Sequence, residues 1–264
     1  MLIFRSALLH QAGHYVQNIY RLEACQYFPA RYSLHLLPTA IRLIRIVYIH
    51  SFRGGKMGTE SKIKLYDLKT SPNCQRVRVV LEEKILPYDT IPVDLTKKEQ
   101  KRAEFLKLNP YGKVPVMIDG EVVLYESCII NEYLEDRYPD PPLMPKEPAK
   151  RAKIRLLIDY ALNHLHPTYW RLREQMMLKK EQERDLKIVE ETKNEIKHLL
   201  QKMEQEIENQ PYLAGEFSLL DVAVIPRFLR LESWGLFQDS RLPRLKEWLK
   251  RMKRRPSVGA IIST

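Results

Sequence analysis

A proline-rich segment divides this chain of 264 residues into two parts whose apolar residues follow different periods. The segment reads PDPPLMPKEP over 139–148, and proline cannot continue a helix or a central strand. Before it, stretches in which apolar and polar residues alternate, as in strands, are interspersed with stretches of helical spacing. After it, the regular stretches all have helical spacing. The sequence therefore predicts two domains joined by an extended linker over 139–149.

The first part, residues 62–138, has the order of a small α/β domain. Strand and helix patterns follow one another as KIKLYDL, SPNCQRVRVVLEEK, YDTIPVD, KKEQKRAEFLKLN, VPVMI, EVVLY and SCIINEYLEDRY. Asp119-Gly120 between the last two strands predicts a two-residue type I′ hairpin turn. The order β-α-β-α-β-β-α predicts a mixed sheet with helices on its faces.

The second part, residues 150–264, is predicted to be an all-helical domain. Two long amphipathic runs cover 150–178 and 183–209. A third helix is expected to start at Ser218, where SLLD is a capping box with Asp221 in place of glutamate. The last helix carries Pro243 near its start, where proline is tolerated.

Residues 1–56 differ from the rest in charge. They contain seven lysines and arginines against one acid, Glu23, and the chain as a whole carries +11. The best apolar run, LLPTAIRLIRIVYIH, contains Pro38, Arg42 and Arg45 and is shorter than the ~20 residues that a spanning helix needs. We expect a basic extension that is disordered or a start assigned too early. The alternative is an organellar transit peptide.

The composition excludes several classes of protein. Cys25, Cys74 and Cys128 are too few and too scattered for a disulfide framework or a zinc site, which favours a reducing compartment, the cytoplasm. No glycine-rich phosphate loop and no H-E-x-x-H zinc motif occurs. A protein without a metal and without a membrane span is expected.

Ser71 and Pro72 are placed to be the N-cap and first residue of a helix. A capping serine accepts a backbone hydrogen bond with its oxygen and keeps its own proton free to donate. That proton, at the positive end of a helix, could stabilise a bound thiolate. The alternative is that Ser71 only caps its helix. Cys74 is expected to be a packed helix residue, because the attacking cysteine of a redox C-P-x-C motif is replaced here by Ser71.

Two further pairs could hold an extended peptide. Val114-Pro115 opens a strand and leaves backbone groups of Val114 free to add a peptide as a further strand. Ser127, at the start of a helix, offers a site for a carboxylate, and Glu126 offers a counter-charge for an ammonium group. Together Glu126 and Ser127 suit one end of an amino acid, although a cap beside a surface acid would look the same.

The combination of Ser71, Val114-Pro115, the Asp-Gly turn, Glu126-Ser127, the proline-rich linker and FSLLDVAV (217–224) resembles the cytosolic glutathione transferase superfamily over 62–264. The resemblance implies an α/β thioredoxin-like N-terminal domain, an all-α C-terminal domain and, usually, a homodimer. It also implies a cis peptide at Val114-Pro115.

The same resemblance assigns roles at a glutathione site. Val114 would bond the cysteinyl part of glutathione, Glu126 and Ser127 its γ-glutamyl end, and Ser71 would activate its thiol. A hydrophobic electrophile would lie between the domains, near the aromatic and imidazole side chains of Tyr160, His164, His166 and Trp170.

Residues 124–156 are also similar to stringent starvation protein A, a transferase-fold protein that acts on RNA polymerase instead of catalysing a reaction. Two departures count against that reading. Pro139-Asp140-Pro141 stands where those proteins usually carry Pro-His-Pro, and Cys74-Gln75 stands where they carry Ser-His.

The basic run RLPRLKEWLKRMKRR (241–255) does not decide between these functions. Eight lysines and arginines would attract an acidic partner, but no nucleic-acid motif accompanies them. A solvated basic face is the expected explanation, without specific nucleic-acid binding.

Overall fold

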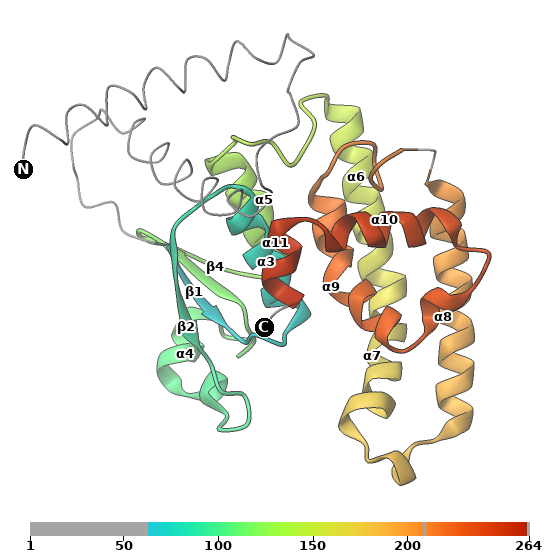
Figure 1. Ribbon diagram of the computed structural model, residues 1–264. Helices are drawn as coiled ribbons and strands as arrows, with labels where there is room; N and C mark the ends of the chain where they lie inside the picture. The colour runs from blue at the N-terminus through green and yellow to red at the C-terminus, as the bar shows by residue number, and fades with distance from the viewer. Residues whose placement is uncertain (1–62, 208–209, 263–264) are drawn as a thin grey trace, which may run out of the picture. The chain divides into compact units, whose positions relative to one another are not determined.

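The structure of the protein is a computed structural model that describes residues 63–207 and 210–262 (Figure 1). The expectations for residues 1–56 lie outside the described part of the chain. The first half contains four strands and their helices: β1 Ile63–Asp67, α3 Pro72–Glu83, β2 Tyr88–Pro92, a 3-10 turn Glu99–Lys101, α4 Ala103–Leu108, β3 Val116–Asp119, β4 Val122–Tyr125 and α5 Ser127–Arg137. This is the order that the sequence predicts.

The sheet has the strand order β2-β1-β3-β4. β1 and β2 run parallel through the α3 crossover, whereas β3 is antiparallel to both β1 and β4. Helix α3 packs against α5. The result is the predicted mixed sheet with helices.

The hairpin turn differs from its prediction. Asp119 pairs with Val122, so the two turn residues are Gly120 and Glu121, one position later than expected. Gly120 has a φ of 61°, and Glu121 is not among the residues with positive φ. A type I′ turn needs positive φ at both central residues, whereas type II′ needs it only at the first. The prediction of a type I′ turn at Asp119-Gly120 is therefore wrong.

The second half is helical, as predicted. Its helices are α6 Pro148–Tyr160, α7 His166–Arg173, α8 Leu186–Glu206, α9 Leu219–Ser233, α10 Pro243–Lys253 and α11 Pro256–Ile262. Two π-helical segments, Ala161–Leu165 and Glu174–Leu178, extend the α6 and α7 run, and 3-10 turns occupy Glu181–Glu183 and Leu236–Gln238. None of the helices in the described ranges is long and apolar enough to span a bilayer.

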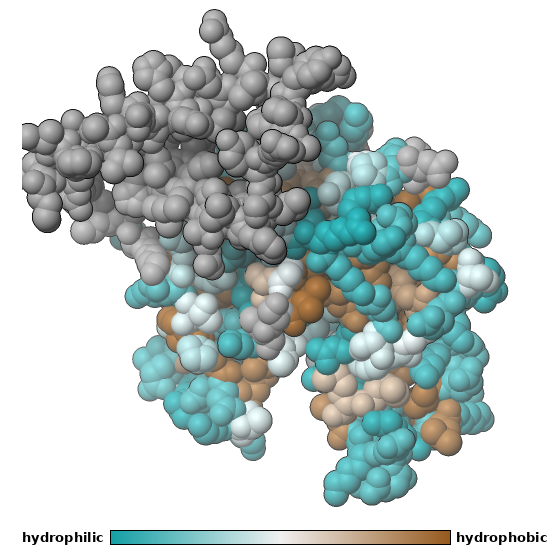
Figure 2. Space-filling view, in the orientation of Figure 1, coloured by the Kyte–Doolittle hydropathy of each residue, from teal (hydrophilic) through white to brown (hydrophobic). Residues whose placement is uncertain are grey.

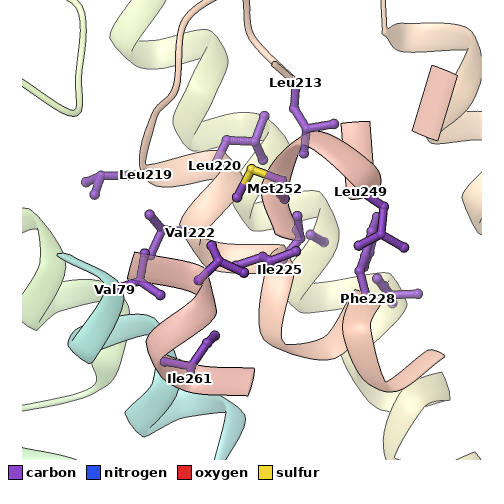
Figure 3. Close-up of a cluster of buried hydrophobic side chains, with 14 of the residues drawn as sticks. Val79, Leu213, Leu219, Leu220, Val222, Ile225, Phe228, Leu249, Met252 and Ile261 are labelled. Atoms are coloured by element: carbon purple, nitrogen blue, oxygen red, sulfur yellow. The ribbon is translucent and has the colours of Figure 1, made fainter. Parts of the chain in front are cut away.

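Helix α9 is the centre of the core. Figure 3 shows Val222 and Ile225 of α9 in one cluster with Val79 of α3 and Ile261 of α11. The start of α9 is fixed by the predicted capping box, in which Asp221 accepts from the backbone N–H and hydroxyl of Ser218. Because α9 contacts both α3 and α10, it joins the sheet half to the last helices.

Asp221 is fully buried and serves more than the cap. Its carboxylate also accepts from Leu213 N–H at 3.1 Å and from Trp248 Nε1–H at 2.7 Å. Burial raises the pKa of the Asp221 carboxyl, and these hydrogen bonds act in the opposite direction. The Asp221 side chain thus connects the start of α9 to α10 and to the loop that precedes α9.

The proline-rich linker is held by a buried ion pair. Lys84 Nζ lies 2.7 Å from Glu135 Oε2 and donates to the carbonyls of Tyr138 and Pro141 at 2.7 and 2.9 Å. Glu135 in turn accepts from the N–H groups of Leu143 and Met144, both at 3.0 Å. The side chains of Lys84 and Glu135 are 0% and 5% exposed. The pair therefore fixes the path of the chain between the two halves.

We predict that Lys84→Met lowers the free energy of unfolding by about 3–5 kcal/mol, because it leaves the Glu135 carboxylate buried without a cation. Urea denaturation at neutral pH measures this. The matched control is Lys187→Met. The Lys187 side chain is 84% exposed, and its Nζ lies 4.0 Å from Glu191 Oε1, at the distance limit of an ion pair. Its effect should stay below about 1 kcal/mol. Equal effects of the two variants would contradict the structural role of the buried pair.

Candidate functional site

Ser71 lies at the N-cap of α3, as predicted. Its Oγ accepts from Cys74 N–H at 3.5 Å, and Pro72 follows as the first helical residue. Ser71 is half-buried at the positive end of a helix of 12 residues.

Cys74 lies one turn into the same helix and is fully buried. Leu68 N–H donates to its Sγ at 3.4 Å. Burial raises the pKa of the Cys74 thiol to about 12, so it stays protonated at neutral pH. The prediction that Cys74 is a packed helix residue is confirmed.

The Val114-Pro115 peptide bond is cis, as the resemblance implies. Strand β3 begins only at Val116, which pairs with Tyr66. Val114 and Pro115 therefore precede the strand, whereas the sequence predicts that they open it. The backbone of Val114 lies outside the ladder as a result.

Glu126 has an unusual backbone for a residue with a side chain, with φ 66° and ψ 106°. Such conformations cost about 1–3 kcal/mol and gather at ligand sites. Glu126 is the N-cap of α5 but makes no side-chain capping bond, and the first turn of α5 contains no acidic residue. The N–H groups at the start of α5 thus lack a side-chain partner there, and Ser127 is buried beside them.

The four residues expected near an electrophile form two separate groups. The rings of Tyr160 and His164 lie 4.7 Å apart, and Tyr160 lines an apolar cavity with Leu157 and Met203. The rings of His166 and Trp170 stack 5.8 Å apart, and Trp170 Nε1–H donates to His166 Nε2. The structure therefore does not bring all four residues together.

The group of His166 and Trp170 is joined to the start of α3 by Arg227. The Arg227 Nη2 donates to Asn73 Oδ1 at 2.9 Å and lies 3.2 Å from His166 Nδ1. Asn73 is two residues after Ser71 in the chain. Residues of α7 and α9 thus lie next to the turn that carries Ser71, and Figure 2 shows the surface hollowed between the sheet half and the end of the helical half near α7.

Arg227 is the residue that the sequence reading missed. It follows Pro226 inside the apolar run LLDVAVIPRFLRL, and it is only 4% exposed. An arginine directly after a proline, in a largely apolar run whose other charged residues are Asp221 and Arg230, was the available signal.

The basic run 241–255 is largely engaged within the chain. Lys253 pairs with Glu232 at 2.6 Å, and Arg255 pairs with Glu83 at 2.7 Å. Arg244 donates to the Ile207 carbonyl at 2.9 Å. Within residues 63–207 and 210–262, no group of three histidine, cysteine or acidic side chains is arranged to bind a metal ion.

Known proteins share both the sequence and the fold. Family models for the glutathione S-transferase N-terminal and C-terminal domains match residues 65–142 and 164–256. Glutathione S-transferase 3 from Zea mays is 33% identical over 208 residues, covering 76% of this chain and 93% of that protein.

A stringent starvation protein A homolog from Haemophilus influenzae is 34% identical over 199 residues, covering 75% of this chain and 88% of that protein. The crystal structure of a theta class glutathione S-transferase from Xanthomonas axonopodis pv. citri, with glutathione bound, has a TM-score of 0.69 at 27% identity. The structural match covers 76% of this chain and 97% of the Xanthomonas axonopodis chain. The chain therefore belongs to the glutathione S-transferase family.

Proposed function

We propose that this protein binds reduced glutathione and activates its thiol for attack on a hydrophobic electrophile. The observation that carries the proposal is the Ser71 hydroxyl, which caps α3 by accepting a hydrogen bond with its oxygen. A hydroxyl in this role can still donate its proton to a ligand. A free thiol has a pKa of about 8.5, so little of it is ionised at neutral pH. A hydrogen bond from Ser71 and the helix end would together favour the thiolate, and a shift of ~2 units would make it the main form.

The rest of glutathione would lie along the edge of the sheet half. We assign the cysteinyl backbone to Val114, whose own backbone lies outside the ladder. We assign the γ-glutamyl carboxylate to Ser127 and the N–H groups of α5, and its ammonium group to Glu126. In this proposal residues 62–138 form the thioredoxin-like glutathione-binding domain, 139–149 the linker and 150–264 the all-helical domain.

The electrophile would face Ser71 from the helical half, close to His166 and Trp170. The setting proposed for this reaction is the cytoplasm, and the proposed assembly is a homodimer, both by analogy with the family. The proposed reaction involves no specific binding of nucleic acid.

The competing function is that of a regulator like stringent starvation protein A, which would bind RNA polymerase without catalysis. The observation that favours it is the 34% identity to the Haemophilus influenzae homolog. The turn that carries Ser71 separates the two functions, because only the transferase needs glutathione there.

For the catalytic role, we expect Ser71→Ala to lower kcat/KM at pH 7 by about 10²–10³-fold, as removal of a hydrogen bond to a developing anion does. The loss should shrink towards pH 9, because an unassisted thiol ionises near pH 8.5. Initial rates with reduced glutathione and 1-chloro-2,4-dinitrobenzene measure it. The control is Ser233→Ala, an exposed serine on α9. Unchanged turnover in Ser71→Ala would remove Ser71 from the mechanism.

For binding, we expect calorimetric titration of the full chain to give a Kd for reduced glutathione between micromolar and low millimolar. Ser127→Ala should weaken it by about 5- to 10-fold, the effect of one hydrogen bond of ~1 kcal/mol. The absence of both heat and thermal stabilisation would turn attention from glutathione to RNA polymerase.

Cys74 gives an independent check on the chemistry. We expect it to resist iodoacetamide at pH 8 in the native protein, because its thiol is buried and its pKa is about 12. Peptide mapping by mass spectrometry should find it alkylated only after denaturation, whereas the half-buried Cys128 should react earlier. Rapid native labelling of Cys74 would reopen a thiol-based mechanism for this chain.

A further inference from the structure

Arg227 carries a buried charge without an acidic partner. Its side chain emerges from the middle of α9, and the residue is 4% exposed. Within the described ranges, no carboxylate oxygen lies within the 4.0 Å that defines an ion pair with it, and its Nε makes no hydrogen bond. The partners that it has, Asn73 and His166, are uncharged amide and imidazole groups. A buried guanidinium in such a place is costly unless an anion joins it.

The surroundings of Arg227 are themselves positive. The pKa of His166 is lowered to about 4 by burial and by the charges of Arg76 and Lys113. Both Trp170 Nε1–H and the Arg227 guanidinium face the His166 ring as donors. A neutral imidazole has one nitrogen that can accept a hydrogen bond, whereas an imidazolium has none. At neutral pH His166 is therefore uncharged, and it leaves the charge of Arg227 uncompensated.

A second buried arginine strengthens the field. Arg76 is 1% exposed, and its Nε and Nη2 make no hydrogen bond, while its Nη1 donates to Cys128 Sγ at 3.0 Å. Its charge acts on His166, whose pKa it helps to lower, and His166 is in contact with Arg227. An anion bound at Arg227 would be attracted by both charges, which at low local dielectric act over several ångströms.

The position of Arg227 indicates which anion would bind. The residues proposed to hold glutathione, Val114, Glu126 and Ser127, all belong to the sheet half. Arg227 and His166 belong to the helical half, and their contact with Asn73 brings them next to the Ser71 turn. A group on Arg227 would therefore lie on the side from which the second substrate approaches the thiol.

We infer that Arg227 binds a carboxylate of the second substrate, which makes the preferred electrophile an aromatic or unsaturated carboxylic acid. An aromatic surface for such a molecule is present in Trp170, which is 43% exposed and packs against His166, the imidazole that Arg227 contacts. This inference rests on the proposed thiol transfer at Ser71 for its reaction, but not for the anion site itself.

A pair of aromatic probes shows how the reaction would run. In 4-chloro-3,5-dinitrobenzoate the glutathione thiolate attacks the carbon that bears chlorine. A C–S bond forms, the C–Cl bond breaks, and chloride leaves with the bonding electrons. The thiol proton passes to solvent. The methyl ester of the same molecule undergoes the same substitution without the carboxylate charge.

The test compares the two probes on the full chain and on Arg227→Met. We expect the KM for the carboxylate to rise about 10- to 100-fold in the variant, as loss of a hydrogen bond to a charged group predicts. The KM for the ester and the KM for glutathione should each change less than about 2-fold, since neither the binding of the ester nor the binding of glutathione involves the carboxylate of the probe. Arg227→Lys should recover part of the loss because it restores the charge but not the planar fork. The charge-matched control is the exposed Arg254→Met.

An equal change in KM for the carboxylate and the ester, or a change in KM confined to glutathione, would overturn the inference.

A binding measurement tests the anion site independently of the folding of a variant and of catalysis. Calorimetry of the wild-type chain with 3,5-dinitrobenzoate and its methyl ester, without glutathione, should show at least about 10-fold tighter binding of the acid. If glutathione fails to bind but this preference holds, the proposed transferase function fails and the anion site stands. If glutathione binds and the preference is absent, the anion site fails alone.

Discussion

The buried ion pair between Lys84 and Glu135 is the interaction on which the arrangement of the two halves depends. Burial of two charges is unfavourable unless the remaining donors and acceptors are also used. Here the Lys84 ammonium reaches two carbonyls, and the Glu135 carboxylate receives two backbone N–H groups from the linker. The pair satisfies a stretch of backbone that prolines prevent from forming regular structure. The burial of Leu143 and Met144 and the hydrogen bond from Leu219 N–H to the Leu143 carbonyl hold the same stretch from the side of α9.

Helix α3 links the buried Lys84–Glu135 pair to the proposed thiol site. Its C-cap is Lys84 and its N-cap is Ser71, so the two ends of one rigid element connect the linker to the proposed thiol centre. Between these ends α3 packs on α5 and on α9, which carries Arg227. A helix of 12 residues is about 18 Å long, and little bending is expected over that distance. The positions of Ser71 and Arg227 are thus set by the same packing.

Much of this could be predicted from the sequence, because local chemistry decided it. The order of elements followed the apolar periods, and the caps at Ser71 and Ser218 followed from hydroxyls before helical runs. The hairpin register did not, since Asp-Gly is compatible with more than one turn and strand pairing chose between them. Residues spaced along one helical run also could not be assigned to one site, because a difference of two positions places His164 and His166 on different faces.

The roles that depend on tertiary contacts were beyond the sequence. Nothing in a glutamate predicts positive φ at Glu126, because that conformation is imposed by the hairpin on one side and α5 on the other. Arg227 was likewise visible only as one of three charged residues in a largely apolar run until the fold placed Asn73 and His166 around it.

The strained backbone of Glu126 affects the free energy of folding and the free energy of ligand binding differently. Its cost is met during folding, when hairpin and helix close around it, and is already included when a ligand arrives. A peptide that binds there does not have to bend the chain, so its affinity is not reduced by the distortion. Relaxing Glu126 with a glycine, which adopts positive φ freely, would therefore favour a more stable protein with a less preorganised site.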